Sequence, residues 1–346
     1  MARQVLVAVA SVVGVSRAAR REMTRLALAL CLPAASAAAS SCASIPPDPP
    51  LPASAWPGAG WLGDGSPSLQ GWDIYQKMLV DGATGPPGGE RWIEELVTER
   101  LPGLGTLIME PPRSGFRYGG GGGAGGSNAS AFAAAVAAFR RRGVRVVLYS
   151  SVVHLGEDAE WASGNLSRQH PEFSQRLRDS SPATLETKPM LSPSSAAAVA
   201  YSLNYTLDLL RRFPADGVYL DDNQLGGNAS DPADYSAAAV SGWREYLSAR
   251  FGQEWSAQCL GYATISSAPI PAPPVENRSV VEQAQWGAWL RYRQRTMALS
   301  NEVFRSALHR RIGADGQPLG LVVGNELQFP SYVLATELQL YHEDAV

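Results

Sequence analysis

The sequence predicts an α/β fold with a mainly parallel sheet, and two features of the chain point to it. Helical patterns alternate with short apolar runs over most of the 346 residues, as they do in repeated βα units. Two of the apolar runs, residues 218–220 and 319–323, lead directly into acidic and amide side chains. In α/β barrels the carboxyl ends of the strands carry the catalytic groups, so these two strand ends are candidate site positions.

The first 50 residues are expected to be a targeting segment followed by a linker. From Met23 onward, a charged start, an apolar run at 26–32 and small residues at 34–37 form the pattern of a secretory signal peptide. The alternative is an arginine-rich, serine-containing transit peptide for an organelle. Prolines within 46–52 predict an extended linker, and a single domain is expected over 51–346. The chain is therefore expected to be secreted or to lie in an endomembrane lumen.

Composition and short motifs limit which partners the chain can bind and which kinds of site it can form. Five glycosylation sequons agree with a secretory route, and they begin at Asn128, Asn165, Asn204, Asn228 and Asn277. The net charge of −3 provides no basic surface for nucleic acid, and no stretch after the leader is long and apolar enough for a membrane helix. With cysteines at 31, 42 and 259 alone, no disulfide framework is expected, and Cys259 is interpreted as a small buried apolar residue. No cofactor is indicated.

In the first half of the chain the elements follow from apolar spacing and from the residues that end them. Helical spacing predicts a helix over 131–142, and Gly143 ends it. Residues 144–149 are β-branched and other apolar side chains, which predicts a buried strand. Residues 118–127 are almost pure glycine and predict a flexible surface insertion. A strand near 72–75, a helix over 90–100 and a strand over 104–109 that stops at Pro111 are also expected.

The second half continues the alternation. A helix over 196–213 leads into the strand 218–220. A second helix is predicted over 234–251, with Gly252 as its terminator. A third is predicted over 280–312, and its aromatic stripe is interpreted as core packing. Strands over 319–323 and 333–341 complete the set.

The stretch 216–223, Asp-Gly-Val-Tyr-Leu-Asp-Asp-Asn, resembles the fourth-strand signature of glycosyl hydrolases with a TIM-barrel catalytic domain, a group related to the α-galactosidase-like and β-galactosidase-like barrels. The resemblance runs from about Trp92 to Tyr341 and includes the segments 149–151, 170–173, 243–247, 250–252 and 324–326. It implies a (β/α)8 TIM-type barrel. Such a barrel has eight strands, whereas about six can be counted here. Either some strands near the N-terminus cannot be recognised from the sequence, or the barrel is incomplete at its C-terminus.

The resemblance also implies an activity: cleavage of an O-glycosidic bond by two strand-end carboxyl groups, with retention of configuration at the sugar. In such families the acid at the end of the fourth strand is the nucleophile, which makes Asp221 the first candidate and Asp222 the second. Side chains alternate along a strand, so only one of the two can point inward. Glu326 is the candidate general acid/base and Glu337 the fallback. Glu326 follows a later strand than the one where those barrels carry this acid, which is a departure from their pattern.

The candidates for substrate binding lie at or just after predicted strand ends, and they are Tyr149, His154, Trp161, Tyr219, Asn223 and Asn325. The aromatic rings offer faces for stacking on a carbohydrate, or they are ordinary packing residues. His154 can bind a sugar hydroxyl, or it can bond a loop carbonyl.

Other interpretations of the same residues remain open. The run 221–223 can be a turn that caps the next element. The chain can also be a carbohydrate-binding barrel without catalysis, or a truncated pseudoenzyme. A metal-dependent barrel hydrolase would use Asp221, Asp222 and a histidine as ligands, but His154 and His170 do not have the spacing of paired ligands.

Overall fold

The computed structural model of the chain describes residues 42, 68–70, 90–100, 102–109, 111, 129–151, 165–185, 188–221, 223–227, 232–273, 279–313 and 316–323. The chain divides into two compact units. One is made of Met1–Asp48 and Arg244–Ala288, and the other of Pro49–Trp243 and Trp289–Val346. The single domain expected over 51–346 stays a prediction.

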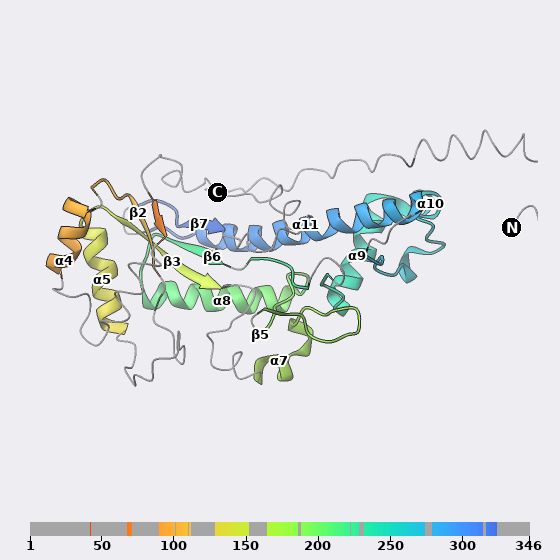
Figure 1. The fold of residues 1–346 in the computed structure, drawn as a ribbon, viewed down its shortest axis with the longest axis horizontal. Coiled ribbons are helices and arrows are strands. Elements are labelled where there is room, and N and C mark those ends of the chain that lie inside the picture. The colour runs from red at the N-terminus through yellow and green to blue at the C-terminus, as the bar shows by residue number, and fades with distance from the viewer. Residues whose placement is uncertain are drawn as a thin grey trace, which may run out of the picture. The chain divides into compact units, whose positions relative to one another are not determined.

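The larger unit is built on a five-stranded sheet (Figure 1). Its strands are β1 (Ser68–Gln70), β2 (Thr106–Met109), β3 (Arg145–Ser151), β6 (Gly217–Asp221) and β7 (Gly320–Val323). They lie in the order β1-β2-β3-β6-β7, and every neighbouring pair is parallel. The prediction of a parallel α/β sheet is therefore confirmed, while closure into a barrel stays a prediction. The strand expected at 72–75 lies outside the described residues, and β1 precedes it.

Helices connect the strands, as parallel pairing requires. They are α4 (Glu90–Glu95) with the π-helical turn η2 (Leu96–Arg100), α5 (Ala129–Arg141), α8 (Ala196–Arg212), α9 (Ala237–Arg250) and α11 (Val280–His309). One face of the sheet packs against α4, η2, α5, α8 and α11, through Leu107, Val146, Leu148, Val218, Leu220 and Leu321. Figure 1 shows α8 running beside β3 and β6. Each fully buried Leu or Val contributes about 1.5–3 kcal/mol, so this face carries the main core of the unit.

The ends of the helices follow local chemistry. Gly143 has a φ of 78° directly after α5, as its predicted role as terminator requires. The hydroxyl of Ser195 accepts from the backbone N–H of Ala198 at 3.3 Å and caps α8. The helix predicted to begin at residue 234 begins at Ala237, because Ser236 is its N-cap and accepts from the N–H of Ala239 at 3.2 Å.

The entry into β6 is fixed by a part-buried ion pair. Arg140, in the last turn of α5, donates from Nε to both carboxylate oxygens of Asp216 at 3.1 Å. The backbone N–H of Val146 donates to Asp216 Oδ2 at 2.9 Å. Asp216, the first acid of the stretch 216–223, is therefore a structural residue at the amino end of the strand.

Several shorter elements were not predicted from the sequence. They are α7 (Asn165–Gln169), the 3-10 turns η3 (Pro171–Phe173) and η4 (Ile265–Ser267), the antiparallel pair β4 (Thr184–Leu185) and β5 (Lys188–Pro189), and α10 (Gly252–Cys259). Each is short, so it gives little periodic signal.

The smaller unit is held together by hydrogen bonds from glutamine side chains and by stacked aromatic rings. Gln253 closes the loop after α10: its Nε2 donates to the carbonyl of Ala263 at 2.9 Å, and its Oε1 accepts from the N–H of Ile265 at 3.0 Å. Gln285 Nε2 donates to the carbonyl of Leu260 at 2.6 Å. The ring of Phe251 stacks on that of Trp255 with centroids 4.4 Å apart.

A disulfide between Cys42 and Cys259 belongs to the same unit, and it corrects two expectations. The Cα atoms of the two cysteines lie 5.2 Å apart, although 217 positions separate them in sequence. The prediction of no disulfide framework left out this bond, and Cys259 is buried as predicted but is one half of a disulfide and not a free apolar residue. A partner at that separation is brought close by tertiary folding and leaves no local pattern.

Candidate active site at the carboxyl edge of the sheet

The second face of the sheet carries an aromatic pair. Along β3, Val146 and Leu148 belong to the helix-covered face, so Val147 and Tyr149 belong to the other. Tyr149 is paired in register with Tyr219 of β6, and their ring centroids lie 5.9 Å apart at an angle of 37°. Both rings are 9% exposed. In the described structure these two candidates pack on each other, and their use as a platform for a sugar stays a prediction.

The carboxyl end of β6 lies between two neighbouring strands of the sheet. β6 pairs with β3 on one side and with β7 on the other, and Ser151 and Asp221 are partners in register. Asp221 is the last residue of β6. The first candidate for the nucleophile therefore lies at the carboxyl end of a strand that has a partner strand on each side.

The loop that continues from β6 is anchored by two buried amides. Asn223, predicted as a substrate-binding residue, donates from Nδ2 to Asn301 Oδ1 of α11 at 2.6 Å. Gln175 Oε1 accepts from the N–H of Gly226 at 2.8 Å, and its Nε2 donates to the carbonyls of Leu191 at 2.9 Å and Gln224 at 3.4 Å. Gln175 is fully buried. Segment 223–227 is thus held against the rest of the unit immediately after the candidate acids.

Asp234 is a second buried anchor on the same side of the unit. Its Oδ1 accepts from the backbone N–H groups of Ser236 at 2.7 Å and Arg176 at 3.0 Å. Its Oδ2 accepts from the hydroxyls of Ser192 and Ser236. Burial raises the pKa of Asp234, and these four hydrogen bonds offset part of that rise. The carboxyl group ties the segment around residue 176 and the serine at 192 to the start of α9.

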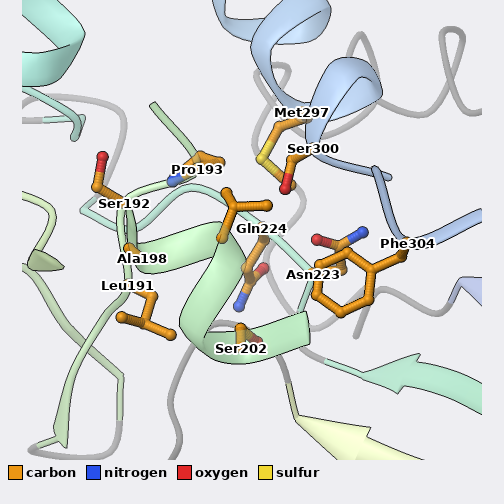
Figure 2. Close-up of a pocket in the computed structure, with 11 residues that line it drawn as sticks. Leu191, Ser192, Pro193, Ala198, Ser202, Asn223, Gln224, Met297, Ser300 and Phe304 are labelled. Atoms are coloured by element: carbon orange, nitrogen blue, oxygen red, sulfur yellow. The ribbon is translucent and has the colours of Figure 1, made fainter. Parts of the chain in front are cut away.

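A pocket opens next to these anchors, with walls from α8, α11 and two loops (Figure 2). The hollow has a volume of about 290 Å³, part of which is open to solvent. The residues that line it include Leu191, Ser192, Pro193, Ala198, Ser202, Asn223, Gln224, Met297, Ser300 and Phe304. Its polar groups are hydroxyls and amides, which can exchange hydrogen bonds with water or with hydroxyl groups. Beside it, the Nδ2 of Asn301 is a buried donor without a partner in the described part of the chain.

The remaining site candidates lie outside the described residues, so the structure does not place them. They are Asp222, His154, Trp161, Asn325, Glu326 and Glu337. The backbone of Asp221 is described within β6, and Tyr149, Tyr219 and Asn223 are described with their side chains. The distance from Asp221 to a second carboxyl group therefore stays a prediction.

Three residues of this region were not singled out by sequence reasoning. Asp234 carried a recognisable signal, because Asp-Tyr-Ser directly before a helical pattern is a capping sequence. Gln175 and Asn301 carried none: each is an isolated amide whose partners come from distant segments.

Two further observations concern metal binding and membrane-spanning helices. Among the residues with described positions, no three His, Cys, Asp or Glu side chains gather as a metal-binding group. Within the same ranges, no helix has the length and apolar character needed to cross a membrane.

Comparison with known proteins gives a likeness of fold. No protein-family model matches the chain, and no curated protein matches its sequence. A beta-galactosidase from the Antarctic haloarchaeon Halorubrum lacusprofundi is 13% identical, with a TM-score of 0.50 over 73% of this chain and 36% of that chain. A GH42 beta-galactosidase is 12% identical, with a TM-score of 0.50 over 75% of this chain and 35% of that one. The chain spans about a third of the length of these enzymes, and it is similar to them in the fold of that part.

Proposed function

We propose that the chain is a glycoside hydrolase that cleaves an O-glycosidic bond at the carboxyl edge of a (β/α)8 barrel. The observation that carries the proposal is the position of Asp221, at the carboxyl end of a parallel strand with a partner strand on each side. The likeness of fold to two beta-galactosidases supports the same class of reaction. The substrate is a carbohydrate.

In the proposed reaction, Asp221 is the nucleophile and Glu326 the general acid/base. The carboxylate attacks the anomeric carbon while the acid protonates the leaving oxygen, and water then releases the sugar with its configuration retained. This requires two carboxyl groups about 5–5.5 Å apart. Asp222 and Glu337 are the second choices for the two roles. The buried amides of Gln175 and Asn301 support the site by holding the loop that follows Asp221.

The test is hydrolysis of aryl glycosides by the full chain. A panel of 4-nitrophenyl α- and β-galactosides, glucosides and mannosides is assayed with wild type, Asp221→Asn and the control Asp208→Asn. Asp208 is a partly exposed residue of α8 that pairs with Arg211 and Arg212. We expect Asp221→Asn to lower kcat by about 10⁴-fold or more, because the covalent step is lost. The control is expected to keep wild-type turnover.

A second variant distinguishes the role of nucleophile from a supporting one. In Asp221→Ala, added azide is expected to attack the anomeric carbon from the vacated side and to give a glycosyl azide of inverted configuration. Wild-type turnover in Asp221→Asn would contradict the assignment of Asp221. If wild type binds the sugars without hydrolysing any of them, the chain is a carbohydrate-binding barrel and the proposed activity is wrong.

A further inference from the structure

One of the five sequons falls on a described helix with its side chain in place. Asn204 lies within α8 and is exposed to solvent, together with Ala197, Ala200 and Arg211. The opposite stripe of the helix faces the core and consists of Ala198, Val199, Ser202, Thr206, Leu209 and Leu210. A large hydrophilic group on Asn204 would therefore extend into solvent without disturbing the packing of α8.

The second recognition residue of this sequon is on the buried stripe. Thr206 is fully buried, and its hydroxyl lies 3.2 Å from the hydroxyl of Ser150 on β3. An enzyme that must reach both the amide of Asn204 and the hydroxyl of Thr206 can do so only before α8 packs on the sheet. Modification of this site therefore has to precede folding.

The disulfide provides an independent indication of the compartment. Cys42–Cys259 joins distant segments of the chain, and bonds of this kind form and persist in oxidising environments such as the lumen of the secretory pathway. Cys42 follows the small-residue region at 34–37, so the bond would survive removal of a leader there. The same lumen holds the machinery for N-glycosylation.

We propose that Asn204 carries an N-linked glycan, attached in the secretory lumen before the chain folds. The amide nitrogen of Asn204 loses a proton and bonds to the anomeric carbon of a diphosphate-activated, lipid-linked oligosaccharide. The bond from that carbon to the diphosphate oxygen breaks, and the lipid diphosphate leaves. This inference does not depend on the glycosidase proposal.

The test is mass spectrometry of the full chain, expressed from Met1 in a eukaryotic cell. Trypsin yields a peptide of residues 179–211 in which Asn204 is the only asparagine, since Lys188 precedes a proline and is not cut. Release of the glycan by a peptide N-glycosidase in heavy-oxygen water converts a modified Asn204 to labelled aspartate. We expect the label in wild type and in Thr206→Ser, which keeps the sequon, and its loss in Asn204→Gln.

The order of events is tested separately. Unglycosylated, folded chain and a synthetic peptide of residues 200–210 are each incubated with oligosaccharyltransferase and lipid-linked oligosaccharide. We expect the peptide to be glycosylated and the folded chain to remain unmodified at Asn204. Glycosylation of the folded chain would show that modification does not have to precede folding. If Asn204 stays unlabelled in the cell-expressed chain, the proposal is wrong, whether or not the Cys42–Cys259 peptides are found linked.

Discussion

Asp234 shows how much of this molecule depends on single buried polar groups. Four hydrogen-bond donors from three segments converge on one carboxyl group that is 2% exposed. A group of this kind is costly to bury and costly to remove, because its donors would be left without an acceptor. The serine at 192, which lines the pocket, depends on it for its position.

We expect Asp234→Ala to lower the free energy of unfolding by about 2–4 kcal/mol, since four donors, three of them in buried hydrogen bonds, lose their acceptor. Asp234→Asn keeps the shape and is expected to cost less. Urea unfolding at neutral pH measures both. The control is Asp179→Ala, an exposed acid that bonds its neighbour Ser181. Equal stability of wild type and Asp234→Ala would contradict the role of Asp234 as an anchor.

The contribution of Asp234 to the free energy of unfolding should change with pH in a definite direction. Burial raises the pKa of Asp234 above the value of about 3.9 that it has in the unfolded chain, so the folded state holds the proton more tightly. Its contribution to stability is therefore greatest below about pH 3.9 and is lost as the pH rises through the raised pKa. Asp234→Asn lacks this loss. The free energy of unfolding of wild type relative to Asp234→Asn, measured by urea unfolding from about pH 4 to 8, should fall with rising pH. If this difference stays constant or rises with pH, the predicted direction is wrong.

At the scale of elements, the larger unit consists of a regular βα frame and of loops that side-chain hydrogen bonds hold to this frame. The frame follows the apolar pattern: the predicted strands and helices 104–109, 131–142, 144–149, 196–213 and 319–323 all appear, with ends shifted by a few residues. The segments around 165–192 and 223–236 have no such pattern. They are positioned by Gln175, Asn301 and Asp234, whose partners lie far away in sequence.

Gln175→Leu tests this division. The variant removes an acceptor from the N–H of Gly226 and a donor from the carbonyl of Leu191. We expect a loss of about 2–4 kcal/mol in the free energy of unfolding, because several buried backbone groups lose a partner. If the site is catalytic, kcat should fall more than KM changes, since the loop after Asp221 loses its anchor. The control is Gln169→Leu, at an exposed position in α7. A Gln175→Leu protein as stable as this control would contradict the anchoring role.

At the scale of the whole molecule, a covalent link closes a very long loop of chain. Cys42 and Cys259 are 217 positions apart, and both belong to the smaller unit. A crosslink across so many residues removes a large amount of conformational freedom from the unfolded chain. The N-terminal segment and residues 244–288 are therefore joined in one unit.

We expect replacement of both cysteines by serine to lower the free energy of unfolding by about 2–4 kcal/mol. Thermal unfolding of the full chain, with and without reductant, measures the effect. Reductant should lower the Tm of wild type to that of the double variant and leave the variant unchanged. The same Tm for both proteins without reductant would show that the bond does not form.

The sequence by itself determined the frame of this protein: the parallel α/β sheet, the helices between its strands and the position of Asp221 at a strand end. These are local properties, since apolar periodicity, glycine terminators and polar residues after a strand act within a few residues. The tertiary structure decided which residues hold the candidate site in place. Gln175, Asn301 and Asp234, and the partner of Cys259, each make at least one contact with a segment more than 40 residues away. Such contacts exist only once the chain has packed, so no local sequence pattern predicts them.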